Sequence, residues 1–425
     1  MPPRIARRTL LGAAGVLAVG AAVPAVRWLS RGSDEVARGP YGALRPDPEG
    51  VFDLLEGFSY RVVDRQGRRM SDGFRVPARP DGMACFEGDD GALVLMRNHE
   101  IPSGGQYLGM GHGGEVPREA YDPGAAGGVT RLVLDPESFA VRSSNLVLTG
   151  TSMNCGGGPS PWGWITCEED PTDLHGFAFL CDPSATSVQR PVRIDGFGRF
   201  RHEAAAVHPD TFVTYLSEDR PDSCLYRFVP HDPSSPFEGR LQALQVVGRA
   251  REDTGPLGAG ARREVGWLDL AHTSPEDDSL RYQAQQLGAA VFRRGEGMCF
   301  GDGATYLCAT SGGPRGDGQI FRLLDEGDGG TLEVLAASES ARQLEMPDNI
   351  VMGPHGTLFL VEDGPGRDCL RGVLPSGVCF AIGQNALSDS EICGVCFSPD
   401  GRTLFLNLQE DGLTLAVHGP FETLT

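Results

Sequence analysis

Carboxylates and one unusual cysteine are the residues of this chain whose types and spacing could do chemistry. The stretch NCGGGPSPWGWITCEE, Asn154 to Glu169, places Cys155 beside three glycines and ends in the adjacent acids Glu168 and Glu169. A thiolate in surroundings rich in oxygen ligands indicates a transition metal such as iron, and glycines let a backbone pass close to a metal or a bound anion. Alternatively, Cys155 is a small buried residue before a tight turn. The residues alone leave both interpretations open.

Acidic and amide side chains recur in short motifs along the whole chain. The motifs PDGMACF, RHEAAAV, GEGMCF, PDNIVM and EICGVCF contain the candidate ligands Asp81, Glu203, Glu296, Asp348, Asn349 and Glu391. Apolar stretches end in further polar residues: His99 and Glu100, Glu168 and Glu169, Glu218 and Asp219, Glu362 and Asp363, and Gln409. Carboxylate and amide oxygens suit calcium, which takes six to eight oxygen ligands.

Repulsion between such acids favours metal binding over a bare solvated rim. Two unit charges about 4 Å apart repel by about 4 kcal/mol at an effective dielectric near 20. A cluster of carboxylates without cations would therefore have to stay partly protonated or move apart. Because residues on a strand point alternately to opposite sides, at most one of Glu168 and Glu169 is expected to be a ligand.

Arg294 is the basic residue most suited to a substrate. It lies two residues before Glu296 in RRGEGMCF, so both side chains can face the same side of an extended segment. A guanidinium beside metal-bound carboxylates forms a natural fork for a phosphate or carboxylate group. The alternative is a plain salt bridge to a neighbour. Asn154 and His99 are further catalytic candidates, although a histidine on a strand is more often structural.

A repeat positions these residues. Six apolar strands, LVLMRNHE, WITCEED, VTYLSED, YLCATSGG, LFLVEDG and LFLNLQE, each follow one of the polar motifs and precede a third strand. The third strands are GVTRLVLD, HGFAFLCD, SCLYRFVP, GQIFRLLD, GVCFAIGQ and GLTLAVHG. Units of three or four strands are typical of propeller blades. The sequence predicts an all-β fold, a single six-bladed β-propeller domain over residues 45–425, with the polar motifs converging at one end of its axis.

Two inserts interrupt the repeat. One is glycine-rich, from Ile101 to Gly127, and the other runs from about His231 to Arg293. The second contains SPEDDSLRYQAQQLGAAV, in which Ser274 suits a helix cap and Pro275 the first helical position. We expect one short helix there.

The N-terminus predicts export. Arg7 and Arg8 precede an apolar run from about Leu10 to Val26, which is typical of a twin-arginine signal, with a cleavage after Ala25 or retention as an anchor. Residues 1–30 are assigned to this segment, the export machinery is an expected partner, and the mature protein is expected to be periplasmic or secreted. A net charge of −20 argues against nucleic acid and anionic membrane surfaces as partners. We expect a monomer.

Taken together and in order, the motifs RNHE, NCGGGPSPWGWITCEE, GRFRHEAAAVHP, EGMCF, PDNIVMGPHGTLFLVEDG and GVCFSPDG resemble those of the PhoX-type alkaline phosphatases. The resemblance extends from about Val51 to Gln409. It implies a propeller that is exported by the twin-arginine route and hydrolyses phosphomonoesters with an iron and calcium cluster. By this resemblance Cys155 is a ligand of iron, Arg294 contacts phosphate, and the nucleophile is a metal-bound oxide or hydroxide. The carboxylates implied as metal ligands are Glu203, Glu296, and the acids of PDN and EDG, Asp348, Glu362 and Asp363.

Two other functions fit the same residues. A calcium-dependent propeller lactonase or esterase would also gather Glu, Asn and Asp from separate blades, but it needs no thiolate. A non-catalytic propeller would hold its metals for stability alone. Cys155 discriminates against the first, and turnover of an ester discriminates against the second.

Overall fold

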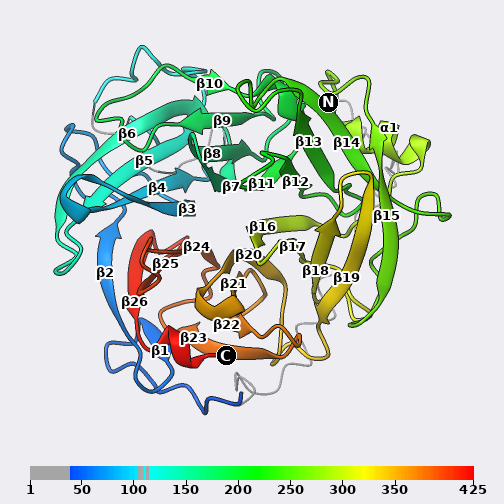
Figure 1. Ribbon diagram of the computed structural model, residues 1–425. Coiled ribbons are helices and arrows are strands. Elements are labelled where there is room, and N and C mark those ends of the chain that lie inside the picture. Colours follow the sequence, from blue (N-terminus) through cyan, green and yellow to red (C-terminus); the bar gives the residue numbers. More distant parts are fainter. Residues whose placement is uncertain (1–38, 103–106, 108, 112–113) are drawn as a thin grey trace, which may run out of the picture. The chain divides into compact units, whose positions relative to one another are not determined.

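Strands β1 to β26 form five antiparallel sheets in this computed structural model, which describes residues 39–102, 107, 109–111 and 114–425 (Figure 1). The first sheet has the order β3(Pro80–Glu87), β4(Leu93–His99), β5(Gly127–Leu134) and β6(Val141–Thr151). The second has the order β7(Asn154–Ser160), β8(Gly163–Glu168), β9(Ala178–Cys181) and β10(Val192–Arg193).

Three further sheets complete the fold. A nine-stranded sheet has the order β11(His202–Val207), β12(Thr214–Glu218), β13(Tyr226–Pro230), β14(Gly239–Val246), β15(Arg262–Asp269), β19(Gly329–Ala337), β18(Gln319–Asp325), β17(Ala304–Ala309) and β16(Gly295–Gly301). A five-stranded sheet has the order β20(Pro347–Met352), β21(Leu358–Glu362), β22(Cys369–Val373), β23(Cys379–Asn385) and β1(Phe52–Leu54). The last sheet has the order β24(Ile392–Phe397), β25(Thr403–Leu408), β26(Leu413–His418) and β2(Ser59–Arg65).

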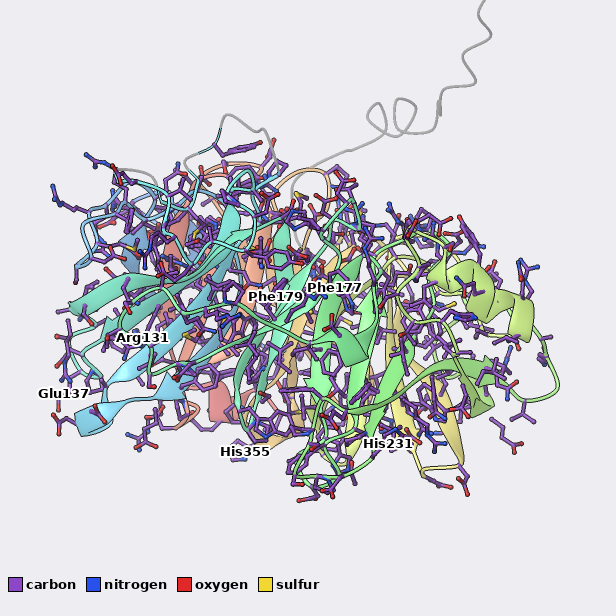
Figure 2. The ribbon with its side chains drawn as sticks, turned by 90° about the horizontal axis from the view of Figure 1, so that it is seen from above. Arg131, Glu137, Phe177, Phe179, His231 and His355 are labelled. Carbon is purple, nitrogen blue, oxygen red and sulfur yellow. The ribbon has the colours of Figure 1, made fainter. Side chains whose placement is uncertain are left out.

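The sheets stand around a central axis in a propeller-like arrangement (Figure 1). Strands β3, β7, β11, β16, β20 and β24 lie nearest the axis, each contacts the next, and β24 contacts β3. All six begin at the same end of the axis. The turn that follows β20 contains His355, which lies at the lower edge of the view in Figure 2.

Most apolar cores lie between neighbouring sheets, and one lies between the two halves of the nine-stranded sheet, where Tyr215 of β12 packs with Leu307 of β17. Alternation along the strands sends apolar side chains to both faces, so Trp164 of β8 packs with Val94 of β4, and Tyr226 of β13 packs with Ile165 of β8. A further cluster joins the two ends of the ring, where Phe405 of β25 packs with Leu95 of β4. Burial on both faces explains why these strands read as nearly continuous apolar runs.

The first two strands pair with strands from the last part of the chain. β2 pairs with β26, from Ser59 opposite His418 to Arg65 opposite Leu413, and β1 pairs with β23. The ring is therefore closed by an early strand that completes the sheet of the final strands.

The all-β, propeller-like arrangement is confirmed, and two details of the prediction are wrong. The segment GVCFAIGQ is the fourth strand of its sheet, β23, because CLRGV forms the third strand, β22. The helix α1 spans Leu280–Leu287 and follows Ser279, not Ser274. Leu280 and Ala284 are buried against the core around Tyr226, so packing, and not the Ser-Pro pair, decides where this helix begins.

The insert from about His231 to Arg293 contains β14, β15 and α1; β15 pairs with β14 and β19 and so joins two groups of four strands into one sheet. The predicted export segment, residues 1–30, lies outside the described residues. Among the residues that are described, no helix is long and apolar enough to span a bilayer.

Candidate metal centre

A hydrogen bond that recurs in every unit of the ring sets the geometry of the site. The residue before each inner strand accepts the backbone N–H of the residue that follows the second strand. The six pairs are Arg79 with Glu100, Met153 with Glu169, Arg201 with Asp219, Arg294 with Thr310, Met346 with Asp363, and Glu391 with Gln409. These twelve residues form a rim at the end of the axis where the inner strands begin.

A β-bulge follows at once in each inner strand. The register shifts lie between Pro80 and Met83, Asn154 and Gly157, His202 and Ala205, Gly295 and Met298, Pro347 and Ile350, and Cys393 and Cys396. A bulge releases residues from the ladder and re-aims their side chains. The second residue after each rim position is Asp81, Cys155, Glu203, Glu296, Asp348 or Cys393. The first five lie inside the bulge, whereas Cys393 still pairs with Asn407 just before it. The repeat therefore brings ligand-type side chains to one level of the axis.

Glycines in the bulges let the inner strands approach each other. A Cβ on Gly82 would lie 2.7 Å from the carbonyl oxygen of Cys155, and one on Gly156 would lie 2.5 Å from that of Glu203. Such distances exclude any side chain without backbone movement. The glycines after Cys155 are thus explained by close packing around the axis.

Cys155 is held by its backbone and keeps some solvent exposure. The Asn98 amide donates to the carbonyl oxygens of Cys155 at 2.8 Å and Gly156 at 2.6 Å, and the Trp164 indole donates to Asn98 at 2.8 Å. The thiol groups with Glu100 and Glu169, whose ligand atoms lie within 4.8 Å of one another. Through its hydrogen bond to Asn98, Trp164 therefore helps to hold the backbone of the NCGGG motif.

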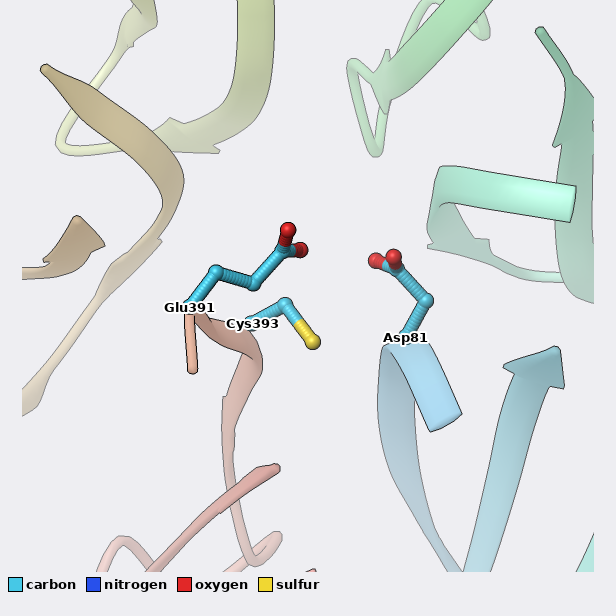
Figure 3. Close-up of side chains that lie close together, drawn as sticks. All are labelled: Asp81, Glu391 and Cys393. Carbon is cyan, nitrogen blue, oxygen red and sulfur yellow. The ribbon is translucent and has the colours of Figure 1, made fainter. Parts of the chain in front are cut away.

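Two further groups of ligand atoms, each within 4.8 Å, lie beside the first. One consists of Glu203, Glu296 and Asp348. The other consists of Asp81, Glu391 and Cys393, whose side chains converge in Figure 3. The Gln409 amide links the groups, since it lies 2.6 Å from Asp81, 2.7 Å from Glu391 and 3.0 Å from Glu100.

The electrostatics of these groups fit cations. Burial and neighbouring carboxylates raise the pKa of Glu203 to about 7, and they raise the pKa values of Asp81, Glu296 and Asp348 well above the usual range. Both carboxylate oxygens of Glu203 and Oδ1 of Asp81 are buried without a hydrogen-bond partner in the described part of the chain. Buried carboxylates without partners are costly, and bound metal ions would supply the missing partners. The donor set, oxygens with thiols, fits the metals that the sequence predicts.

Arginines occupy the open side of the site. Arg294 donates to Asp219 at 2.7 and 3.1 Å and lies 2.7 Å from Glu296. Arg201 donates to Glu169 at 2.7 Å and lies 3.8 Å from Asp219. Their side chains are 29 % and 27 % exposed, so both guanidinium groups can reach a ligand from solvent. A pocket of about 540 Å³, lined in part by Glu169, Arg201 and Arg220, opens beside Arg201.

Several predicted site residues lie elsewhere. His99 is fully buried between the Ala78 carbonyl at 2.8 Å and the Thr130 hydroxyl at 2.9 Å, and burial lowers its pKa to about 3. The Asn154 amide is occupied by Thr151 and Thr166. Neither side chain is placed to reach a substrate.

Glu168 and Glu362 likewise point into the sheets. Glu168 accepts the backbone N–H groups of Ser152, Gly176 and Phe177 and contacts His175 at 2.7 Å. Glu362 accepts from Arg371 at 2.5 Å and from two backbone N–H groups. Alternation sends the residue after each of them, Glu169 and Asp363, to the rim.

Asn349 lines the axis, but its side-chain oxygen already accepts the N–H of Gly394. Sequence reasoning missed Arg201 and Cys393. The internal repeat could have found both, because Arg201 aligns with Arg294 and Cys393 aligns with Cys155.

The ring is propeller-like, and buried carboxylates and a partly exposed thiol gather at one end of its axis. This combination is expected of a metal-dependent protein. A family model described as alkaline phosphatase PhoX matches residues 39–147 and 138–412. The chain therefore belongs to the PhoX alkaline phosphatase family and is an enzyme of the alkaline phosphatase class.

A solved structure shares the fold. PhoX of Pseudomonas fluorescens, in complex with vanadate as a transition-state analogue, is 17 % identical with a TM-score of 0.70, covering 91 % of this chain and 98 % of that chain. XC5397 of Xanthomonas campestris, a gluconolactonase, is 12 % identical with a TM-score of 0.48, covering 90 % and 99 %. No curated protein matches the sequence significantly.

Proposed function

We propose that this chain hydrolyses phosphomonoesters at the rim of its axis, using iron and calcium ions held by the three ligand groups. The observation that carries the proposal is the set of buried carboxylate oxygens without partners, on Glu203 and Asp81, near two partly exposed arginines, of which Arg294 contacts Glu296 of the same ligand group as Glu203. Cations would bind the carboxylate oxygens that lack partners, and a dianionic phosphate would suit the two arginines.

Ligand chemistry divides the proposed ions. Cys155, with Glu100 and Glu169, would hold iron, because a thiolate favours a transition metal. Glu203, Glu296 and Asp348 offer only oxygens, which favours calcium. When bound, such ions would neutralise the acids, bind phosphoryl oxygens and activate the attacking nucleophile.

The chain's own residues would orient the substrate. Arg294 presents its guanidinium to the phosphoryl oxygens, and Asp219 fixes its position through two hydrogen bonds. Arg201, held by Glu169, approaches from the neighbouring unit. Two arginines on one side place positive charge where negative charge develops in the transition state.

For the architecture we propose six blades, the nine-stranded sheet being two blades joined through β15. Six inner strands in sequential contact and six equivalent rim hydrogen bonds support this count. We further propose a monomer that is exported by the twin-arginine route to the periplasm or beyond, on the basis of Arg7 and Arg8 in the N-terminal segment.

One experiment tests the function against its alternatives. The purified exported chain is analysed for iron and calcium by mass spectrometry and assayed with p-nitrophenyl phosphate and with a lactone. Cys155→Ala is compared with Cys181→Ala, which removes a buried thiol of a sheet core. We expect phosphatase activity that is lost together with the iron bound by Cys155, and only in Cys155→Ala. Lactone hydrolysis that is unchanged in Cys155→Ala, or bound metals without hydrolysis of either substrate, would contradict the proposal.

A further inference from the structure

Cys393 occupies the ligand position of the sixth unit. The N–H of Gln409 binds the Glu391 carbonyl, as that of Glu169 binds Met153 and that of Glu100 binds Arg79. The residue two positions after the rim residue is Cys155 in one unit, Asp81 in another and Cys393 in the last. The first residue of each inner strand pairs with the last of the second strand in both cases, Asn154 with Glu168 and Ile392 with Leu408.

The surroundings of Cys393 contain the other parts of a metal site. Its Sγ lies within 4.8 Å of ligand oxygens of Asp81 and Glu391 (Figure 3). Asp81 and Cys393 are fully buried, and Oδ1 of Asp81 has no hydrogen-bond partner in the described part of the chain. The thiol now donates to the Pro80 carbonyl at 3.1 Å, a contact that it would give up when its proton is lost to a metal.

We propose that Cys393 is a second sulfur ligand of the centre, and that Asp81, Glu391 and Cys393 form a transition-metal site next to that of Cys155, whose Sγ lies 3.7 Å from Oδ2 of Asp81. A thiolate with two carboxylates favours iron or zinc over calcium, which prefers oxygen alone. Binding forms the metal–sulfur bond and releases the thiol proton to solvent, with no change of oxidation state. The inference rests on the proposed metal centre.

Metal content and metal–sulfur coordination test this assignment without any assay of turnover. The full chain is purified with its metals, its transition metals are counted by mass spectrometry, and sulfur neighbours are measured by X-ray absorption at their edges. Variants are Cys155→Ser, Cys393→Ser and the double variant, with Cys181→Ser as the matched control for loss of a buried thiol.

We expect sulfur coordination to persist in Cys155→Ser and to vanish only in the double variant. Cys393→Ser should lose the transition metal of one site while its calcium content stays at the wild-type level. Complete loss of sulfur coordination in Cys155→Ser, or wild-type metal content and spectrum in Cys393→Ser, would overturn the proposal.

Two further readouts keep the outcome decisive. If Cys393→Ser does not fold, as judged by circular dichroism, the wild-type spectrum and metal count decide: sulfur bound at two transition metals supports the site, and sulfur at one overturns it. If the wild type hydrolyses no phosphomonoester but shows two sulfur-bound metals, the proposed function fails while this inference stands.

Discussion

At the scale of single residues, adjacent acids at the end of a second strand have opposite roles. Glu168 binds four groups of its own sheet, whereas Glu169 reaches the rim and contacts Arg201. Composition and spacing predict that one of the two faces the axis. They do not tell which one, because that depends on the register of β8 against β7, which pairs Glu168 with Asn154.

We expect Glu168→Gln to destabilise the protein by about 1 to 3 kcal/mol, because an amide cannot accept all the hydrogen bonds that the buried carboxylate accepts. Its metal content should not change. Glu169→Gln should do the reverse, losing metal with little loss of stability. Thermal unfolding and metal analysis of both variants check this, and equal metal loss in the two would contradict it.

Substrate binding gives a second test at this scale. Arg294→Ala should lower kcat/KM for p-nitrophenyl phosphate by about 10²-fold or more, since a charged donor to the phosphoryl group is lost. Asp219→Asn should act in the same direction but less strongly, by weakening the hold on Arg294. Arg322→Ala, which removes an ion pair with Glu333 far from the rim, is the control. Steady-state kinetics that leave Arg294→Ala unchanged would exclude it from the site.

At the scale of elements, the bulge at the start of each inner strand is what turns a strand into a source of ligands. It frees Asp81, Cys155, Glu203, Glu296 and Asp348 from the ladder at the same place in successive units. The polar motifs could be read from the sequence as a repeat. The bulges could not, because they are set by pairing between strands rather than by local residue preferences.

We expect Gly156→Ala to disrupt the centre, because its Cβ would collide with Glu203, whose carbonyl oxygen would lie 2.5 Å away. Gly266→Ala in β15 is the matched control, since its Cβ would meet only the flexible Gln245 side chain at 3.5 Å. Metal content by mass spectrometry should fall in the first variant and not in the second. Wild-type metal content in Gly156→Ala would show that the close approach is not required.

At the scale of the whole molecule, the ring concentrates negative charge that the strands alone cannot balance. The repeat, the all-β class and most second strands were predictable, because apolar runs and turns are local. The join through β15, the fourth strand at GVCFAIGQ and the start of α1 were not, because long-range pairing and burial decide them. The burial and the hydrogen-bond partners of His99 and Asn154 were not predictable for the same reason.

Removal of metal should make stability depend on pH in a defined direction. In the metal-free chain the pKa of Glu203 is raised from 4.5 to about 7, so the folded state binds this proton more tightly than the unfolded state. The resulting stabilisation is complete below the unfolded pKa and is lost as the pH rises through about 7. Melting temperatures after chelation should therefore fall from about pH 5 to about pH 8, and added metal should remove this trend. A melting temperature that rises with pH after chelation would contradict the assignment.

Closure of the ring also fixes an order of events during synthesis. β2 pairs with β26, so a strand that is synthesised early can form this pairing only after one of the last strands has been synthesised. The ligand groups draw on residues from Asp81 to Cys393, so a chain that ends before Glu391 lacks two of them, Glu391 and Cys393. Such a truncated product can be distinguished by the ions that it fails to hold.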